Sequence, residues 1–215
     1  MKYLCVLLLL SVSVIAAPTQ DDLDHQLLVA ASAGRTEEAK FLMEHGANVN
    51  TVDNRLKSPL LYAVLKGHID TMKLLVEHGA SVNAADDHKR SPLHGAALGG
   101  HLEAVTFLIE HMANVNDENK YEETPIHYAS INGHEEVVKY LVEHGANVNA
   151  GDDYKQAPLH KAASNGHAKV IQALIEHGAN INAVDVFQHS PLHYAATKGH
   201  KEAVKYLNEH GAKNY

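Results

Sequence analysis

The sequence predicts an all-α repeat protein, a solenoid of six helix-turn-helix units that are each 33 residues long. Self-similarity at a fixed period is the signature of such an architecture. Prolines, Gly-His pairs and Glu-His pairs all recur every 33 residues, without an insertion. The repeating residues are the prolines Pro59, Pro92, Pro125, Pro158 and Pro191, the glycines Gly67, Gly100, Gly133, Gly166 and Gly199, and the Glu-His histidines His45, His78, His111, His144, His177 and His210.

Residues 1–16 have the pattern of a secretory signal peptide. Lys2 provides a positive charge, the stretch that follows is apolar apart from two serines, and Val14 and Ala16 are the small residues that suit cleavage. The apolar run is shorter than the roughly 20 residues that a membrane span needs. We therefore expect a secreted protein with no stable membrane insertion. An uncleaved anchor or a buried first helix is the alternative.

The rest of the chain divides into the units 17–50, 51–83, 84–116, 117–149, 150–182 and 183–215. In the last unit, Ser190 is an expected N-cap and Pro191 takes the first helical position, where its missing N–H costs nothing. Gly199 turns the chain into a second helix, which ends at Gly211 in the left-handed cap position. One such unit cannot bury its apolar stripe alone, so the units are expected to stack side by side.

These residues resemble the ankyrin repeat family. The T-P-L-H-x-A signature of that family appears at residues 91–96, 124–129 and 190–195, and its closing G-A-x-V-N appears at 46–50, 79–83, 145–149 and, with Ile181, at 178–182. The resemblance covers nearly all of residues 17–215, which would form one ankyrin repeat domain. It implies an α-solenoid with protruding β-turn fingers and a concave protein-binding face, and it implies no chemistry.

Several positions depart from the repeat pattern. Met112 stands where the other units have the capping glycine, which predicts a bulky residue in left-handed geometry. Ala157 lacks the hydroxyl of an N-cap, and Asn208 replaces an apolar residue, as suits a terminal cap that faces water. Glycine is common near the finger tips of the family, but this chain has other residues there, so the turn geometry is open: Leu56, Lys89, Glu122, Lys155 and Gln188.

The composition narrows the classes of function. The chain is 45% hydrophobic and 20% charged, which is ordinary globular usage and argues against disorder. Its formal charge of −8 argues against nucleic acid or an anionic membrane surface as the partner, since both require clustered Lys and Arg. The single cysteine, Cys5, excludes an intramolecular disulfide and would leave with the signal peptide.

The 18 histidines raise the question of a metal. Fifteen of them fall in three repeat columns, and equivalent residues of adjacent units should lie about 8–10 Å apart. Zinc needs donors that converge at about 2.0–2.1 Å, so we expect a scaffold role and no metal or other cofactor. A His-rich metal-binding protein is the remote alternative. So many groups with a pKa near 6.5 suggest that acidification softens the array.

No catalytic constellation is present in the sequence. Nucleophile elbows, phosphate loops, zinc-protease helices and Cys/His pairs are absent from it, which predicts a protein that is not an enzyme. The pairs Asp86-Asp87 and Asp152-Asp153 lie at the start of fingers, where Asp commonly caps turns. Calcium is the alternative there, but the dense oxygen-ligand loop of a good calcium site is missing.

Columns that vary between units are the candidate contacts for a partner, because the constant columns are needed for stacking. The finger-tip column holds Arg55, His88, Tyr121, Tyr154 and Phe187, and the column facing the groove holds Tyr62, Gly95, Tyr128, Lys161 and Tyr194. A neighbouring column holds Leu65, Leu98 and Ile131. Tyr and Arg dominate interface hot spots, so all of these except Gly95 and Lys161 are predicted partner-binding residues.

The sequence therefore predicts a secreted monomer that binds another protein of unknown identity. A venom or salivary component or an effector would fit an exported array. The alternatives are a self-associating structural scaffold and, if the signal is not cleaved, a membrane-tethered or intracellular adaptor.

Overall fold

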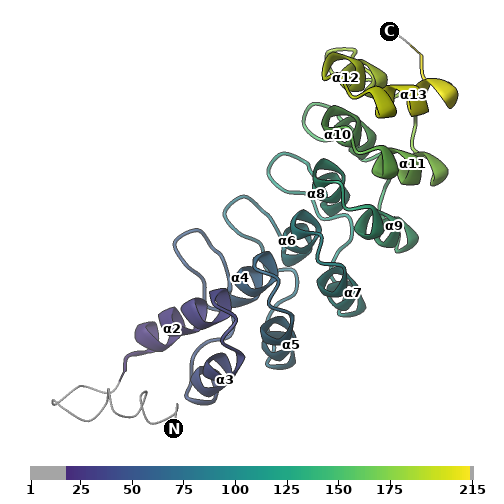
Figure 1. Cartoon of the computed structure of the whole chain (residues 1–215). Helices are drawn as coiled ribbons and strands as arrows, with labels where there is room; N and C mark the ends of the chain where they lie inside the picture. Colours follow the sequence, from purple (N-terminus) through teal and green to yellow (C-terminus); the bar gives the residue numbers. More distant parts are fainter. Residues whose placement is uncertain (1–17, 214–215) are drawn as a thin grey trace.

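The computed structural model describes residues 18–213, so the expected signal peptide and Cys5 lie outside the described part of the chain. Residues 18–213 are all-helical and form consecutive helix pairs (Figure 1), as the repeat spacing predicts. The first helices of the pairs are α2 (Gln20–Ser32), α4 (Pro59–Leu65), α6 (Pro92–Gly99), α8 (Pro125–Asn132), α10 (Pro158–Asn165) and α12 (Pro191–Thr197). The second helices are α3 (Thr36–Glu44), α5 (Ile69–Glu77), α7 (Leu102–Glu110), α9 (Glu135–Glu143), α11 (Ala168–Glu176) and α13 (Lys201–Glu209).

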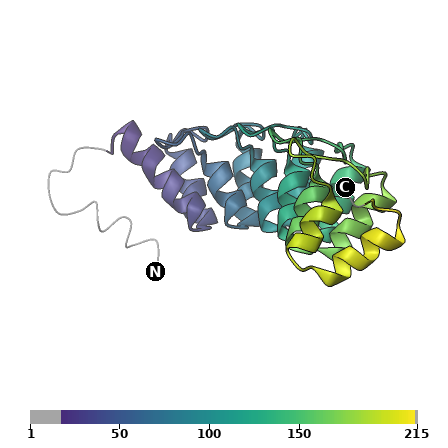
Figure 2. The ribbon, with the colours of Figure 1, turned by 90° about the horizontal axis from the view of Figure 1, so that it is seen from above.

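The pairs stack into a curved array with the first helices on its inner, concave side (Figure 1). A long loop precedes each first helix from α4 onward and projects on that side. We call these loops fingers one to five, at residues 51–57, 84–90, 117–123, 150–156 and 183–189. Seen from above, the fingers run along one edge of the array (Figure 2). Fingers and first helices thus bound the same face of the molecule.

Each first helix from α4 onward begins at a proline in its first turn. The hydroxyls of Ser58 and Ser190 accept hydrogen bonds from the N–H groups of Leu61 and His193, at 3.1 and 3.2 Å, and so cap their helices. Ala157 has no hydroxyl to offer. At that position the N–H of Ala157 itself donates to Nδ1 of His160 at 3.0 Å, so the histidine still ties the start of α10 to its first turn.

A left-handed residue lies two positions after the end of each second helix. It is glycine in most units, for example Gly79 with a φ of 88°, and Met112 with a φ of 68° after α7. The left-handed Met112 that the sequence predicts is therefore confirmed. Its side chain is 82% exposed, so no packing repays the steric cost of this conformation, which is about 1 kcal/mol.

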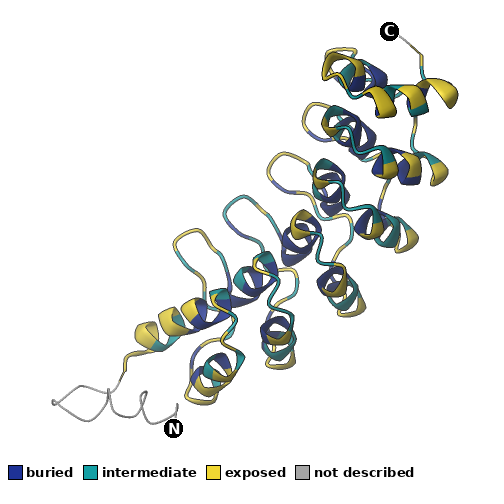
Figure 3. Ribbon diagram, viewed as in Figure 1, coloured by how far each residue is buried: buried dark blue, intermediate teal, exposed yellow. Residues whose placement is uncertain are grey.

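The core runs the length of the array between the two rows of helices (Figure 3). Equivalent apolar residues from successive units are fully buried: Leu60, Leu93, Ile126 and Leu159 from first helices, and Leu75, Leu108, Leu141 and Leu174 from second helices. Asn208 is exposed on α13, whereas the apolar residues of its column are half-buried. None of the helices at 18–213 is long and apolar enough to cross a membrane.

Asparagines that follow the second helices connect each unit to the next. In one of these bridges, Asn116 donates from Nδ2 to the carbonyl of Gly145 at 2.9 Å, and its Oδ1 accepts from the N–H of Asn147 at 2.8 Å. At the N-terminal end, Gln20 and Asp24 of α2 make the corresponding bonds to Gly46 and Asn48. The bridges fix the spacing between neighbouring fingers.

Candidate interaction surface

Each finger is built around one acidic or amide side chain at its base. In finger four, Oδ1 of Asp152 accepts from the backbone N–H groups of Tyr154 and Gln156, at 2.9 and 2.8 Å. The same pair of bonds occurs in every finger, with these residues at the base: Asp53, Asp86, Asn119, Asp152 and Asp185. Short polar side chains that bond to their own backbone are typical turn formers. The first aspartate of each pair, Asp86 and Asp152, therefore caps its finger turn as the sequence predicts.

The residue after each tip is left-handed although it is not glycine. Leu56, Lys89, Glu122, Lys155 and Gln188 have φ values between 57° and 63°. In finger one, the N–H of Leu56 donates to the carbonyl of Asp53 at 2.9 Å and closes the turn. The turn geometry that the sequence left open is therefore the left-handed one, held by the base side chain at a cost of about 1 kcal/mol per residue.

The fingers are joined into one continuous row by backbone hydrogen bonds. The N–H of Asp87 donates to the carbonyl of Arg55 at 2.9 Å, and the N–H of Val186 donates to that of Tyr154 at 3.0 Å. Fingers two and three, and three and four, are joined in the same way. The tips thus form a ribbon, and no finger is a free loop.

The tip side chains predicted to bind a partner differ in their exposure. Tyr121, Tyr154 and Phe187 are 54%, 55% and 60% exposed, and the Tyr154 and Phe187 rings lie 6.2 Å apart. Arg55 is exposed, whereas His88 is half-buried and its Nδ1 lies 2.7 Å from Oδ1 of Asp87. Fingers three to five therefore carry an exposed aromatic ridge, whereas the tips of fingers one and two are Arg55 and His88.

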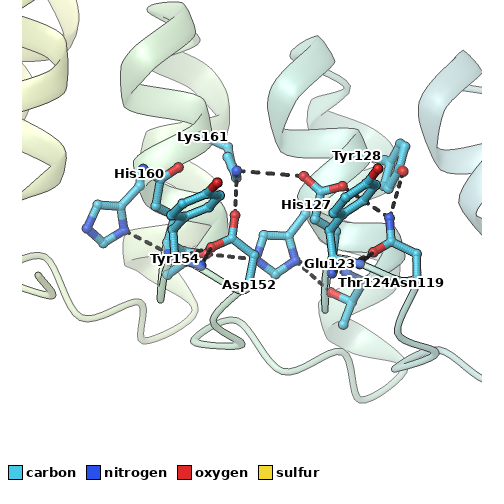
Figure 4. Close-up of polar contacts among 12 residues, drawn as sticks. Asn119, Glu123, Thr124, His127, Tyr128, Asp152, Tyr154, His160 and Lys161 are labelled. Carbon is cyan, nitrogen blue, oxygen red and sulfur yellow. Dashed lines mark hydrogen bonds and ion pairs between the residues drawn. The ribbon is translucent and has the colours of Figure 1, made fainter. Parts of the chain in front are cut away.

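The tyrosines that face the groove form hydrogen bonds to the base residues of the fingers. We call such a contact to a base residue a brace. The hydroxyls of Tyr62 and Tyr194 donate to Oδ2 of Asp53 and Asp185, both at 2.6 Å. The hydroxyl of Tyr128 accepts from Nδ2 of Asn119 at 2.9 Å (Figure 4). All three rings are half-buried. The structure thus gives these predicted binding residues an internal role, and only their exposed ring faces are available to a partner.

In the units that have no groove tyrosine, a positively charged side chain contacts the base residue of the finger instead. Nζ of Lys161 lies 2.6 Å from Oδ2 of Asp152 and 3.6 Å from Oε1 of Glu123, so it joins two fingers (Figure 4). Where the column has Gly95, Arg90 of the finger itself donates from Nε and Nη2 to Oδ2 of Asp86, at 2.9 and 2.7 Å. The sequence did not reveal these braces, although the base residues recur every 33 positions.

The braces shift the acidities of their members. Burial and the hydrogen bond to Asp185 raise the pKa of Tyr194 to about 12. Burial alone would raise the pKa of Asp185, but the hydrogen bonds from Tyr194 and from the finger backbone hold that pKa below its usual value. The hydroxyl and the carboxylate therefore keep these protonation states across the physiological range, and the brace persists.

The apolar column completes the floor of the groove. Leu98 is 38% exposed, and Leu65 and Ile131 are half-buried. The same column is polar in the last two units, at Ser164 and Thr197. The floor is therefore apolar beside fingers one to three and polar beyond them.

The histidines of the signature take part in the scaffold. Nδ1 of His94 accepts from the N–H of Ser91 at 3.2 Å, and its Nε2 donates to the carbonyl of Glu123 in the next finger at 3.0 Å. His127 makes the equivalent bonds to Thr124 and Gln156. Each of these rings uses both nitrogens within the fold.

One cluster of possible metal ligands lies in finger two. Ligand atoms of Asp86, Asp87 and His88 lie within 4.8 Å of one another. Both oxygens of Asp86 already accept hydrogen bonds, and the guanidinium of Arg90 occupies the place of a cation. A second positive charge there would be repelled, so these residues do not fit a metal ion.

A family model described as ankyrin repeats (3 copies) matches residues 2–86, 83–152 and 150–215. The comparison with curated proteins finds no match.

Proposed function

Because the chain belongs to the ankyrin repeat family, we propose that it is a secreted, non-enzymatic protein that binds a partner protein through its finger tips and the concave face of its first helices. Ankyrin repeats mediate interactions between proteins. The observation that supports this surface is the ridge of Tyr121, Tyr154 and Phe187. The rings are exposed, and the finger backbone that carries them is held by hydrogen bonds to the base residues. Aromatic side chains dominate hot spots, and a rigid backbone loses little entropy on binding.

Selection from a phage-displayed peptide library on the immobilised protein would test the surface. Enriched peptides should bind the double variant Tyr121→Ala/Tyr154→Ala about tenfold or more weakly, as expected for hot-spot residues. Thermal stability should change little, because both rings are more than half exposed. Phe41→Ala on α3 is the matched control, since Phe41 is an exposed aromatic of a second helix, away from the fingers. Equal losses for the control, or a loss of binding matched by unfolding, would contradict the proposal.

The proposal of export rests on the sequence of residues 1–16. The intact mass of the chain recovered from the medium of a secreting host should correspond to a start at Ala17 or Pro18. A chain retained in cells with Met1 or Lys2 in place would contradict export, and a membrane-tethered or intracellular adaptor would then be the better proposal. A venom, salivary or effector role depends on export.

A further inference from the structure

The groove column has one position without a side chain. Gly95 of α6 stands where neighbouring units have Tyr62 and Tyr128, and a hollow opens beside it. The hollow is lined by Leu61 and Leu65 from α4, Leu98 from α6 and Arg90 from finger two. The hollow is shallow and opens to solvent, and its enclosed space would hold about one water molecule. The missing ring thus leaves a shallow, largely apolar depression in the groove.

The lining of the hollow suits one apolar side chain. Its leucines contribute aliphatic carbon, and Leu98 is 38% exposed although it is apolar. The carboxylate of Asp86, which is also part of the lining, already accepts four hydrogen bonds, two from the guanidinium of Arg90. An apolar group can therefore enter the hollow without leaving the Asp86 carboxylate unpaired. Burial of that group is favourable by about 25 cal/mol per Å² of apolar surface.

The charge of the fingers changes sign along the row. Fingers one and two carry four cations and three carboxylates, whereas fingers three to five carry two cations and seven carboxylates. The carboxylates of Asp53, Asp86 and Asp87 are all engaged by groups of their own units. Arg55, Lys57 and Lys89 form no ion pair within residues 18–213. Their positive charge therefore remains available, in a chain whose net charge is −8.

The hollow and these cations adjoin each other. Arg90 lines the hollow, Lys89 precedes it in the chain, and the backbone of Arg55 bonds to that of Asp87 at 2.9 Å. Nζ of Lys57 lies 5.5 Å from the centre of the Tyr62 ring in the groove column. An apolar hollow with a positive rim is complementary to an apolar side chain flanked by acidic ones.

We propose that this hollow and the cations of fingers one and two form a docking site for an acidic segment of the partner protein, with one apolar side chain of that segment packed over the depression beside Gly95. The inference rests on the proposed function and adds the chemistry of the partner and its place on the array. Fingers three to five, which are acidic and aromatic, would then contact a different part of the same partner.

Titration of the ¹⁵N-labelled protein with the blocked pentapeptide EEFEE tests the site. Amide shifts should appear at Lys89, Arg90, Gly95 and Leu98, and should fade with EEAEE, with KKFKK and at high salt. In Gly95→Ala the new Cβ would lie 3.2 Å from Cδ2 of Leu65 and fill part of the hollow. Gly95 lies within α6, where alanine is the better helix former, so the variant should fold.

We expect EEFEE to bind Gly95→Ala about fivefold more weakly, the scale of one buried methylene or slightly more. Ser164→Ala, in the same column as Leu98 but beside finger four, should leave the affinity unchanged. Lys89→Gln should weaken binding, whereas Lys155→Gln, at the equivalent tip position of finger four, should not.

An absence of shifts at the hollow, equal binding of KKFKK, or no effect of Gly95→Ala would overturn the docking site. If library-selected peptides still depended on Tyr121 and Tyr154 in that case, the proposed function would stand and only this inference would fail.

Discussion

Single residues in this array are judged best against their counterparts in other units, because the repeat supplies internal controls. Gly95 shows the value of the comparison: its tyrosine counterparts reveal what the unit lacks, and Arg90 shows how the finger is braced without it. Met112 shows the opposite case, a side chain where every counterpart is glycine.

Met112→Gly should raise the free energy of unfolding by about 0.5–1 kcal/mol, because it relieves a left-handed conformation at little loss of packing. The greater freedom of glycine in the unfolded chain offsets part of the gain. Urea unfolding would measure it. Gly79→Met, the reverse change at the equivalent cap, should destabilise the protein by a similar amount. A destabilised Met112→Gly protein would show that the methionine makes a contact that compensates for its strain.

At the scale of the element, the fingers depend on their braces. Lys161 is the brace of finger four, and the side chain of its partner Asp152 is only 3% exposed. Removing one member of a buried pair leaves the other charge without compensation.

Lys161→Met should therefore lower the stability by about 2 kcal/mol, a cost dominated by the stranded carboxylate of Asp152. Lys169→Met is the matched control, because Nζ of Lys169 is well exposed and lies 3.9 Å from Oε2 of Glu135. Such surface pairs contribute about 0–1 kcal/mol. Similar losses in both variants, measured by urea unfolding, would mean that Lys161 is not a brace.

Helix α8 contains a buried hydroxyl that has no hydrogen-bond partner, on Ser130. The equivalent residues of α6 and α10 are Ala97 and Ala163, both fully buried. Ser130→Ala should raise the stability by about 1 kcal/mol, because it removes the desolvation cost of an unpaired hydroxyl. Thermal unfolding would detect the gain. A loss of stability would indicate that the hydroxyl bonds to the backbone of its own helix.

At the scale of the whole molecule, the buried signature histidines link successive units. Nε2 of His94 and of His127 donates to a carbonyl of the next finger. Burial lowers the pKa values of His94 and His160, and lowers that of His127 to about 4. Protonation of Nδ1 would also remove the acceptor for the backbone N–H of the residue before the helix. Acidification therefore weakens the contacts between several pairs of units at once.

The stability of the array should therefore fall between about pH 6.5 and pH 4. In this window the unfolded chain binds protons that the folded chain excludes, since the folded pKa lies below the unfolded value near 6.5. His127 alone should account for roughly 3 kcal/mol over the window. Urea unfolding at pH 7.5 and pH 5 would measure the loss, and His127→Gln should reduce it. A stability that does not change with pH would contradict a structural role for neutral histidines.

The aspartates at the base of the fingers affect the stability in a different pH range. The pKa values of Asp53, Asp86 and Asp185 are lowered, because hydrogen bonds from their braces and finger backbones outweigh the cost of burial. Their contribution is present above a pH of about 4 and is lost below it. Loss of stability between pH 7.5 and pH 5 would thus be assigned to the histidines.

The sequence by itself determined the all-helical repeat fold, the helix caps and the strained Met112. Each unit contacts mainly its neighbours, so the information that specifies a unit lies within about 33 residues and recurs in the chain. Pro191, Gly211 and Leu207 could be read locally for that reason.

Only the tertiary structure decided what the variable columns do. Whether the Tyr62 hydroxyl faces a partner or braces Asp53, and how Arg90 acts beside Gly95, depends on where side chains of a finger and a helix meet. These contacts between side chains depend on how several units pack, and they do not recur every 33 residues in the sequence. The repeat therefore predicts how the units stack, whereas the shape and charge of the groove depend on the residues that differ from unit to unit.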